Sequence, residues 1–338
     1  MAQRPPLIAF DARDAFVAMP HGSGIYVRRL LEALQPLIPG LWPLAHGGRG
    51  PELVWEQVVL PRRLRSRGAA LVHGPDSFLP LRRGCPGVLT VHDLAFEAIR
   101  DDMPLRTGWK YSAFVPRCAR SAERVICPSS FTADDVERRY RVPRERIRVI
   151  AEAPALPAGV LEPPAGPYLL AAGDLRPKKN LGVLVRAFAR LSAEGLPHRL
   201  LLAGADCGTA AELHRLAGDA PVDLLGFVSD ERLDSLLRGA DALVVPSVYE
   251  GFGLVVLDAM ARGCPVVLAR AGALPETGGD AALYFDPDDA LELAGVLRRI
   301  AGVAEERERL SAAGRARAAS FTWEACARAT AAVYEELL

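Results

Sequence analysis

Two carboxylates with glycines between them are the part of the chain best suited to chemistry. Glu250 is followed at once by Gly251, Phe252 and Gly253, and a second acid, Asp258, comes eight positions after the first. Glycines at a turn let backbone amides approach a phosphate at the positive end of the following helix. A carboxylate on that helix can accept hydrogen bonds from both hydroxyls of a ribose. This unit therefore predicts a ligand with phosphates and hydroxyls, such as a nucleotide-sugar.

The residues around these acids predict where they lie in a fold. The run ALVVPS at 242–247 is typical of a buried strand, and the apolar run that begins at Leu254 is typical of a helix. Ligands of an open α/β sheet bind beyond the carboxyl ends of its strands. Glu250 would face the transferred sugar there, and Asp258 the ribose. The alternative is an ordinary strand–loop–helix turn with an acid as helix cap, which explains one carboxylate but not the paired glycines.

A second candidate unit is the basic stretch AAGDLRPKKN at 171–180. Only three of the chain's 41 basic residues are lysines, and two of them, Lys178 and Lys179, are adjacent here. A lysine ammonium is a compact charge suited to a departing diphosphate, and Arg176 is a nearby second candidate. The alternative is a pair of solvated loop charges.

The N-terminal half contributes two weaker candidates. Gly22, Ser23 and Gly24 come just before a helical pattern, so their amides would point at an anion, although such loops also close ordinary turns. His92 ends the apolar run 87–94, where it would face sugar or phosphate, unless it is a structural histidine.

The elements that must position these residues alternate between strand and helix in both halves. An unperiodic stretch rich in Pro, Ala and Gly, 151–167, predicts a linker between an acceptor-binding domain at 1–164 and a donor-binding domain at 165–338. We expect parallel sheets facing each other across a cleft, and a last helix, 322–338, that packs back on the first domain. The helix at 131–140 is expected to begin with Thr132 as its N-cap. The expected strands are 6–12, 70–74, 87–94, 124–129, 168–173, 198–204, 222–226, 242–247 and 265–269.

Composition narrows the class of protein. The chain has 338 residues with no apolar run long enough to span a bilayer, and the N-terminus lacks the pattern of a signal peptide. Its six cysteines stand singly and no cluster has metal-ligand spacing, so we expect reduced thiols, a cytoplasmic location and no metal.

Charge is unevenly distributed along the chain, although it sums to zero. Residues 1–164 hold 23 Lys and Arg against 17 Asp and Glu, and the remainder holds 18 against 24. The ordinary explanation is a solvated surface. The alternative is that the Arg-rich run 61–68 contacts anionic lipid, at the inner face of a membrane, or a lipid-linked acceptor.

Taken together, these motifs resemble the retaining glycosyltransferases of family 4, which have the two-domain GT-B fold. The family pattern P-S-x-x-E-G-F-G-L-x-x-L-E-A-M-A is similar to PSVYEGFGLVVLDAMA here, with Asp258 in place of the second glutamate. DLRPKKN looks like the family's basic motif. The stretches 226–247 and 272–289 resemble the segments on either side of the acidic motif, and HGSGIY, HDL and CPSSFT match more loosely.

The resemblance implies a function as well as a fold. A hexose, mannose or similar, would pass from a nucleotide-diphosphate sugar to a saccharide, lipid-linked or small-molecule acceptor with retention of configuration, as in polysaccharide biosynthesis. GDP-mannose is the donor we expect first. No metal is implied, because the two lysines and the backbone amides would neutralise the diphosphate. No cofactor and no nucleic-acid partner are implied either. Glu250, Lys179 and His92 would be the catalytic residues. The donor would be bound by Lys178, Arg176, Asp258, Gly251, Phe252, Gly253, Leu254, Gly22, Ser23 and Gly24.

Three other classes can be weighed against this expectation. A GT-B sugar-nucleotide epimerase or phosphorylase would share the architecture without requiring the acidic motif. An inactive nucleotide-sugar-binding scaffold would draw support only from the aspartate at position 258. A nicotinamide-dependent dehydrogenase fits poorly, because the first strand is not followed by G-x-G-x-x-G.

Overall fold

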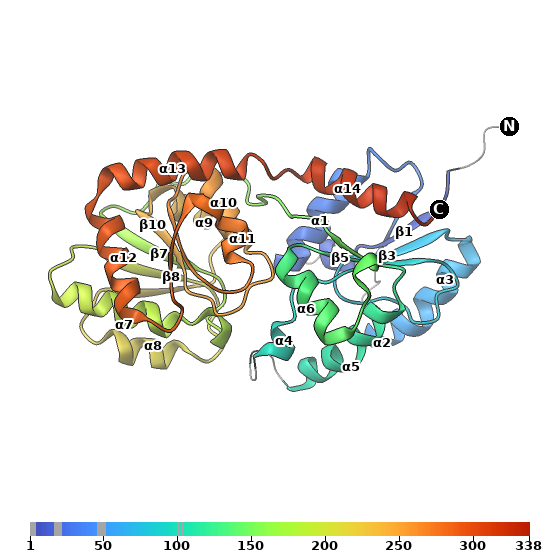
Figure 1. Ribbon diagram of the computed structural model, residues 1–338, viewed down its shortest axis with the longest axis horizontal. Coiled ribbons are helices and arrows are strands. Elements are labelled where there is room, and N and C mark those ends of the chain that lie inside the picture. The colour runs from blue at the N-terminus through green and yellow to red at the C-terminus, as the bar shows by residue number, and fades with distance from the viewer. Residues whose placement is uncertain (1–4, 17–21, 46–51, 100–101, 103–104) are drawn as a thin grey trace. The chain divides into compact units, whose positions relative to one another are not determined.

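The computed structural model describes residues 5–16, 22–45, 52–99, 102 and 105–338, leaving aside the side chains of 105–107. The chain forms two compact units (Figure 1). Unit 1 comprises Met1–Ala153 together with Phe321–Leu338, and unit 2 comprises Pro154–Ser320. Each unit is an α/β fold built on one parallel sheet, which confirms the fold class predicted from the alternating pattern.

Unit 1 contains a six-stranded parallel sheet in the order β2-β1-β3-β4-β5-β6. Its strands are β1 (Ile8–Asp11), β2 (Leu41–Leu44), β3 (Leu71–Gly74), β4 (Gly87–Thr90), β5 (Arg124–Cys127) and β6 (Ile147–Val149). Its helices are η1 (Arg13–Phe16), α1 (Gly22–Leu34), α2 (Glu52–Val54), η2 (Trp55–Val59), α3 (Leu60–Arg67), α4 (Ala95–Ala98), α5 (Leu105–Ser121), α6 (Ser130–Tyr140), η3 (Arg144–Arg146) and α14 (Trp323–Glu335).

Unit 2 repeats this plan with the strand order β12-β11-β10-β7-β8-β9. Its strands are β7 (Tyr168–Ala172), β8 (Arg199–Ala203), β9 (Val222–Gly226), β10 (Ala242–Val245), β11 (Val266–Ala269) and β12 (Ala282–Phe285). Its helices are η4 (Pro177–Lys179), α7 (Leu181–Ala193), α8 (Ala210–Ala217), α9 (Asp230–Gly239), α10 (Leu254–Ala261), α11 (Leu274–Gly278), η5 (Gly279–Ala281), α12 (Ala290–Gly302) and α13 (Ala304–Ala318).

The strand order creates one switch point in each sheet. In unit 1 the chain runs outward from β1 to β2 on one side and from β3 to β6 on the other, so the switch lies between β1 and β3. In unit 2 it lies between β7 and β10, which pair directly. Ligands of doubly wound sheets bind beyond the strand ends at such a point. The candidate residues after β7 and β10 therefore flank the place where the fold favours a ligand.

The last helix, α14, belongs to unit 1 although it follows unit 2 in the sequence. It packs along α1 (Figure 1), and Cys326, Ala327 and Val333 join the core formed by Leu30 and its neighbours. This burial keeps the apolar faces of both helices from water.

A buried hydrogen-bond chain ties α14 to the sheet. The Tyr334 hydroxyl and His73 Nδ1 are 2.6 Å apart, and His73 Nε2 and Thr90 Oγ1 are 2.9 Å apart. Burial lowers the pKa of His73 to about 3, so this imidazole is neutral and can both donate and accept. Each of its nitrogens has a partner, which offsets the cost of placing a polar ring in the core.

The segment that joins the units contains no helix or strand from 150 to 167, yet it is not a free linker. The Ser235 hydroxyl donates to the carbonyl of Glu162 at 2.8 Å. The Arg262 guanidinium donates to the carbonyls of Leu156 and Pro157 at 2.8 and 3.0 Å. These bonds attach the segment to α9 and to the end of α10 within unit 2.

The expected cap of the helix at 131–140 was wrong by three residues. The helix α6 begins at Ser130 with Ser129 as its N-cap, and the Ser129 side chain accepts a hydrogen bond from the Thr132 amide. Thr132 is therefore the capped residue and not the cap. Its own hydroxyl donates to the carbonyl of His92 at 3.3 Å, which ties α6 to the loop after β4.

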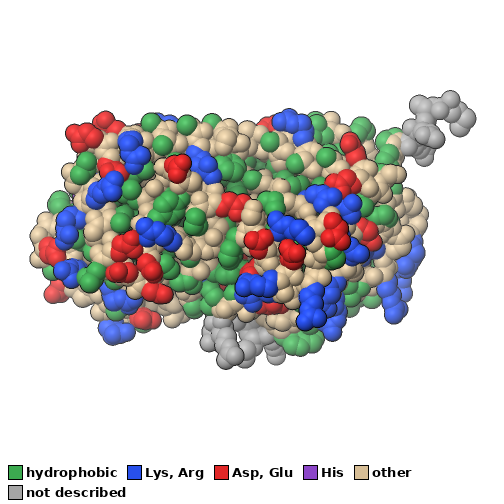
Figure 2. Space-filling view, in the orientation of Figure 1, with side chains coloured by type: hydrophobic (Ala, Val, Ile, Leu, Met, Phe, Trp, Pro, Cys, Tyr) green, Lys and Arg blue, Asp and Glu red, His purple; other side chains and the backbone are tan. Residues whose placement is uncertain are grey.

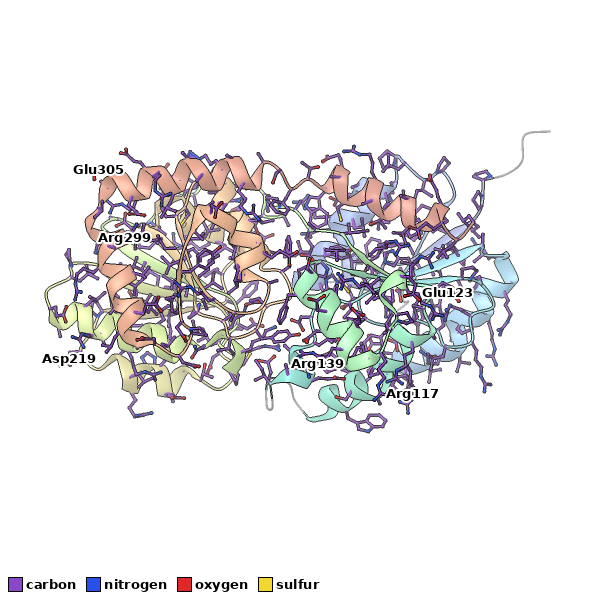
Figure 3. The ribbon with its side chains drawn as sticks, viewed as in Figure 1. Arg117, Glu123, Arg139, Asp219, Arg299 and Glu305 are labelled. Carbon is purple, nitrogen blue, oxygen red and sulfur yellow. The ribbon has the colours of Figure 1, made fainter. Side chains whose placement is uncertain are left out.

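Charged side chains are scattered over the face of each unit that the space-filling view shows. In the space-filling view, side chains of both signs are interspersed with apolar ones (Figure 2). One such pair joins two neighbouring helices: Arg299 on α12 lies near Glu305 in the first turn of α13 (Figure 3), and pairs with Glu306 at 2.7 Å. Exposed pairs of this kind contribute little to stability. No described helix is long and apolar enough to cross a membrane.

Candidate functional site

An ion pair lies at the switch point of unit 2. Lys179 Nζ is 2.6 Å from Glu250 Oε1, and the Ser247 hydroxyl donates to the same oxygen at 2.7 Å. Burial raises the pKa of Glu250, but the two lysines and these hydrogen bonds outweigh that effect and hold the pKa below its usual value. Glu250 is therefore an ionised carboxylate with a fixed orientation at neutral pH.

Backbone contacts explain why this pair forms. The Val248 amide donates to the carbonyl of Lys178 at 2.9 Å, which joins the loop after β10 to the loop after β7. On the other side, the Ala273 amide donates to the carbonyl of Glu250 at 2.9 Å. Gly272 has φ +57°, and a Cβ there would lie 2.6 Å from the Glu250 amide nitrogen. Only glycine fits that contact, so the stretch after β11 packs closely against the backbone of Glu250.

The glycine turn predicted after Glu250 leads directly into α10. Gly253 has φ +95° and precedes the first helical residue, Leu254. Phe252 is buried, and its carbonyl accepts a hydrogen bond from the Thr277 hydroxyl at 2.5 Å. Gly251 is buried beside it. The first backbone amides of α10 therefore lie at the same strand end as Glu250, where they can bind an anion.

Three basic residues, including Lys179, occupy the loop after β7. Lys178 and Lys179 form the last turn of η4, and both are half-buried. Arg176 lies just before this turn, with Nε 3.6 Å from Asp174 Oδ2. Arg176, Lys178 and Lys179 therefore all lie on the loop after β7. Glu250 lies on the loop after β10, the neighbouring strand.

Asp258, unlike Glu250, forms its hydrogen bonds with backbone amides. Its Oδ1 accepts hydrogen bonds at 2.8 Å from the amides of Ala155 and Leu156, in the segment that joins the units. Burial raises the pKa of Asp258, while these two amides act in the opposite direction. One oxygen of this carboxylate is therefore committed to the backbone, and a ribose would have to use Oδ2.

The glycine-rich candidate of unit 1 forms the first turn of α1. Gly22, Ser23 and Gly24 are helical, and a Cβ at Gly22 would meet no other atom. The Ser23 side chain hydrogen-bonds to Asp76, which follows β3. The first residue of this motif, His21, lies outside the described residues.

His92 is engaged at both ring nitrogens. Nδ1 lies 3.0 Å from Glu152 Oε1, and Nε2 lies 2.9 Å from the carbonyl oxygen of Pro75. Burial lowers the pKa of His92, but Glu152, Asp76 and Pro75 reverse this and raise it to about 9. With two acceptors around it, the ring is a fixed imidazolium at neutral pH, and it can influence a ligand through its charge.

Some residues of these sites were not singled out from sequence. Three of them contact a predicted residue: Ser247 contacts Glu250, Glu152 contacts His92, and Asp76 contacts Ser23. Glu152 and Asp76 lie far along the chain from the residues that they contact, and serine is a common residue type. Ser247 alone had a signal, because it stands three positions before Glu250 at the end of the same strand. Among the described residues, no group of three or more His, Cys, Asp or Glu side chains could hold a metal ion.

Comparison with known proteins gives the family. Residues 166–302 match a family described as "Glycosyl transferases group 1", and residues 14–152 match "Glycosyltransferase Family 4". The O-antigen chain mannosyltransferase B of Escherichia coli is 31% identical over 299 residues, which cover 82% of this chain and 78% of that protein. The chain belongs to the family 4, or group 1, glycosyltransferases. The predicted family and enzyme class are therefore confirmed, and the enzyme transfers a sugar from a nucleotide-sugar donor.

Other relatives differ in the reaction that their names print. An MMP alpha-(1->4)-mannosyltransferase of Mycolicibacterium hassiacum is 31% identical over 293 residues, covering 76% of this chain and 67% of that protein. A D-inositol 3-phosphate glycosyltransferase of Saccharomonospora viridis is 33% identical over 242 residues, and only 56% of its length is matched. Membership of the family does not by itself select a donor or an acceptor.

Solved structures confirm the GT-B fold of this glycosyltransferase. Sucrose-phosphate synthase from Thermosynechococcus elongatus has a TM-score of 0.75 at 24% identity, with 99% of each chain covered. HepE from Anabaena, in complex with UDP and glucose, has a TM-score of 0.73 at 19% identity, with 99% of this chain and all of that chain covered.

Proposed function

We propose that the enzyme is a retaining mannosyltransferase that uses GDP-mannose and needs no metal. Two relatives of about 31% identity are named mannosyltransferases, and a third, from Mycobacterium tuberculosis, is named a GDP-mannose-dependent mannosyltransferase. The observation that carries the proposal is the Lys179–Glu250 pair at the switch point of unit 2, next to the first amides of α10. A preorganised cation at this point stabilises the charge that develops on a leaving diphosphate.

The roles within unit 2 follow from charge and position. Lys179 and Lys178, with Arg176 and the amides of Gly251 to Leu254, would bind the two phosphates of the donor. Glu250 would lie against the mannose, where its fixed negative charge stabilises an oxocarbenium-like transition state. As the anomeric carbon–oxygen bond breaks, the acceptor hydroxyl attacks the same face and its proton passes to the departing diphosphate oxygen. Asp258 would contact the ribose through Oδ2.

Unit 1 would bind the acceptor. His92 would steady the sugar and the diphosphate by its positive charge, because both of its nitrogens already have protein partners. Gly22, Ser23 and Gly24 would contribute to donor binding through their backbone amides. The acceptor would be a saccharide, either free or linked to a lipid.

A donor panel tests this proposal. The enzyme is incubated with GDP-mannose, UDP-glucose, ADP-glucose and dTDP-rhamnose, with and without excess EDTA, and products are measured by mass spectrometry. We expect transfer or slow hydrolysis from GDP-mannose, unaffected by EDTA, and NMR of the product should show the α configuration of the donor. Transfer only from a UDP-hexose, or isomerisation of the donor without an acceptor, would overturn it.

A peripheral membrane location is favoured by the surface of α3. This helix buries Leu60, Pro61 and Leu64 and exposes Arg62, Arg63, Arg65 and Arg67. Clustered arginines are attracted to anionic lipid by about 1 kcal/mol each. We therefore propose a cytoplasmic enzyme that contacts the inner face of the membrane. It should co-sediment with phosphatidylserine vesicles at low salt but not with phosphatidylcholine vesicles, and sedimentation independent of lipid charge would contradict this.

A further inference from the structure

The proposed function assigns no role to a pocket at the switch point of unit 1. Its volume is about 320 Å³. Asp14, on η1 directly after β1, and Asp76, directly after β3, both line it. The pocket therefore lies beyond the ends of the two strands between which the sheet changes direction, where this fold favours a ligand.

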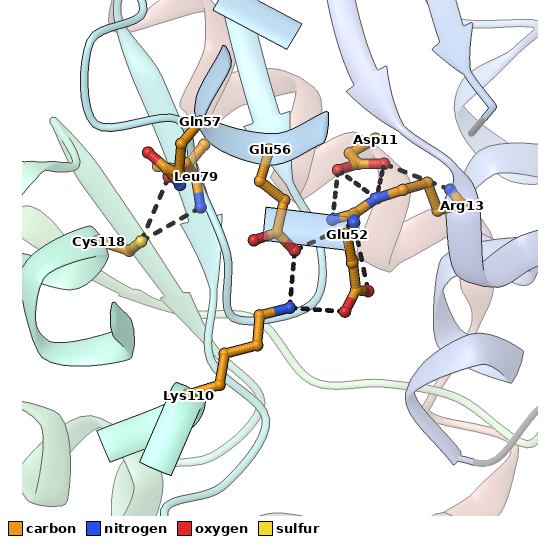
Figure 4. Close-up of polar contacts among 8 residues, drawn as sticks. All are labelled: Asp11, Arg13, Glu52, Glu56, Gln57, Leu79, Lys110 and Cys118. Carbon is orange, nitrogen blue, oxygen red and sulfur yellow. Dashed lines mark hydrogen bonds and ion pairs between the residues drawn. The ribbon is translucent and has the colours of Figure 1, made fainter. Parts of the chain in front are cut away.

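The cations of this pocket are already neutralised by protein carboxylates. Arg13 Nε lies 2.9 Å from Asp11 Oδ1, and Arg13 Nη1 lies 3.0 Å from Glu56 Oε1. Lys110 Nζ bridges Glu52 at 2.7 Å and Glu56 at 3.0 Å (Figure 4). The positive charges of Arg13 and Lys110 are thus paired with three carboxylates. Asp14 and Asp76 add two further acidic side chains to the pocket. The pocket carries an excess of negative charge, which disfavours an anion.

Two polar side chains that line the pocket, Asp14 and Tyr111, are half-buried. Burial, aided by the charge of Asp76, raises the pKa of Asp14 to about 6. A ligand that exchanges hydrogen bonds with these two groups would offset the cost of removing them from water.

An apolar surface completes the lining. The rings of Phe78 and Tyr111 meet edge to face, with centroids 5.0 Å apart, and Lys110 Nζ lies 4.2 Å from the Phe78 centroid. Carboxylates that accept from hydroxyls, together with a phenol and an aromatic surface that can cover C–H groups, match the two faces of a sugar ring. The size is that of a small-ligand site.

The pocket also adjoins the residues of unit 1 discussed above. Asp76 accepts a hydrogen bond from Ser23, and its charge acts on His92. Asp76 therefore links the pocket to Ser23 and His92 within unit 1.

We propose that this pocket binds a neutral sugar of the acceptor through hydrogen bonds to Asp14, Asp76 and Tyr111, and that its negative charge excludes phosphorylated acceptors. This inference rests on the proposed transferase function, and it adds the chemical class of the acceptor. Asp14 and Asp76 select the acceptor and take no part in breaking the donor bond.

The test compares neutral and phosphorylated acceptors at pH 7.5. Methyl α-glycosides of mannose, glucose and galactose are offered beside the 6-phosphates of the same sugars, with the donor identified by the panel above. We expect transfer to at least one methyl glycoside and at least about tenfold less to its phosphorylated counterpart. Asp14→Asn should raise KM for the glycoside about tenfold, since the acceptor of the sugar's hydrogen bond becomes neutral.

Controls separate this inference from the function on which it rests. Asp134→Asn, on the exposed face of α6, should leave KM unchanged. Donor hydrolysis without acceptor should be the same in wild type and Asp14→Asn. Equal use of the sugar phosphates, no transfer to any methyl glycoside, or an unchanged KM in Asp14→Asn would overturn the pocket assignment while donor hydrolysis persists. Absence of hydrolysis and of nucleotide binding in the wild type would overturn the transferase proposal itself.

Discussion

Lys179 and Glu250 stand 71 positions apart in the sequence, and their charged atoms meet at 2.6 Å. The pair joins the two loops that follow the neighbouring strands β7 and β10. In the proposed mechanism, it would keep a lysine in place for a diphosphate and a carboxylate in place for a sugar before either arrives. Such preorganisation avoids the cost of orienting charges during the reaction.

The charge state of Glu250 predicts how the protein responds to acid. Since its pKa is held below the ordinary 4.5, its ion pair adds stability above that pH and loses it as pH falls through the lower, folded-state value. Glu250→Gln should therefore be less stable than wild type in urea unfolding at pH 7. The difference should shrink below pH 4. A difference that is constant with pH would show that the Glu250 charge does not contribute.

His92 predicts the opposite pH dependence for unit 1. Its pKa rises from 6.5 to about 9, so its pairing with Glu152 stabilises the fold fully below pH 6.5 and is lost as pH rises through 9. We expect wild type to lose on the order of 2–3 kcal/mol of unfolding free energy through this group between pH 6.5 and 9.5. His92→Gln should lack that loss. Parallel pH profiles of the two proteins in urea unfolding would contradict the assignment.

The hydroxyl of Tyr334 should matter more than the surface charge two residues later. Tyr334→Phe leaves a buried nitrogen of His73 without its partner, and we expect a loss of about 1–3 kcal/mol in unfolding free energy. Glu336, on the same turn, pairs with Arg124 and Arg148 near the surface. Glu336→Gln is the matched control and should cost less than about 1 kcal/mol. Equal losses would mean that the buried chain does not hold α14.

Asp258 should act on the segment that joins the units as well as on any ligand. Asp258→Ala removes the acceptor of two backbone amides, and we expect about 2–4 kcal/mol less stability. Hydrogen exchange should rise at Ala155 and Leu156. Exchange at these two amides that matches wild type would contradict the anchoring role. A separate measurement tests the ribose contact: weaker binding of GDP than of 2′-deoxy-GDP by wild type would contradict ribose recognition by this carboxylate.

The sequence predicted the sheet cores better than their edges. The missed strands β2, β6 and β12 are all edge strands of their sheets, and none of them is buried along its whole length. Interior parallel strands are buried on both faces and give continuous apolar runs, which is the pattern that reveals them. Short edge strands such as LWPL and IRV lack this pattern.

The candidate sites show the same limit. Motifs within one loop, such as the turn from Glu250 to Gly253, can be recognised because their spacing is local. The bonds from Asp258 to Ala155 and from Arg13 to Glu56 join residues 103 and 43 positions apart, and only the folded chain brings them together. The acidic pocket of unit 1 was missed for this reason.

Nucleotide binding by Lys179→Ala tests the central claim most directly. GDP and guanosine are titrated calorimetrically into wild type, Lys179→Ala and the exposed control Arg190→Ala. We predict that wild type and Arg190→Ala bind GDP much more tightly than guanosine, and that Lys179→Ala loses at least about tenfold of that preference while guanosine binding is unchanged. An undiminished preference for GDP in Lys179→Ala would contradict the claim that this lysine, held by Glu250, receives the diphosphate.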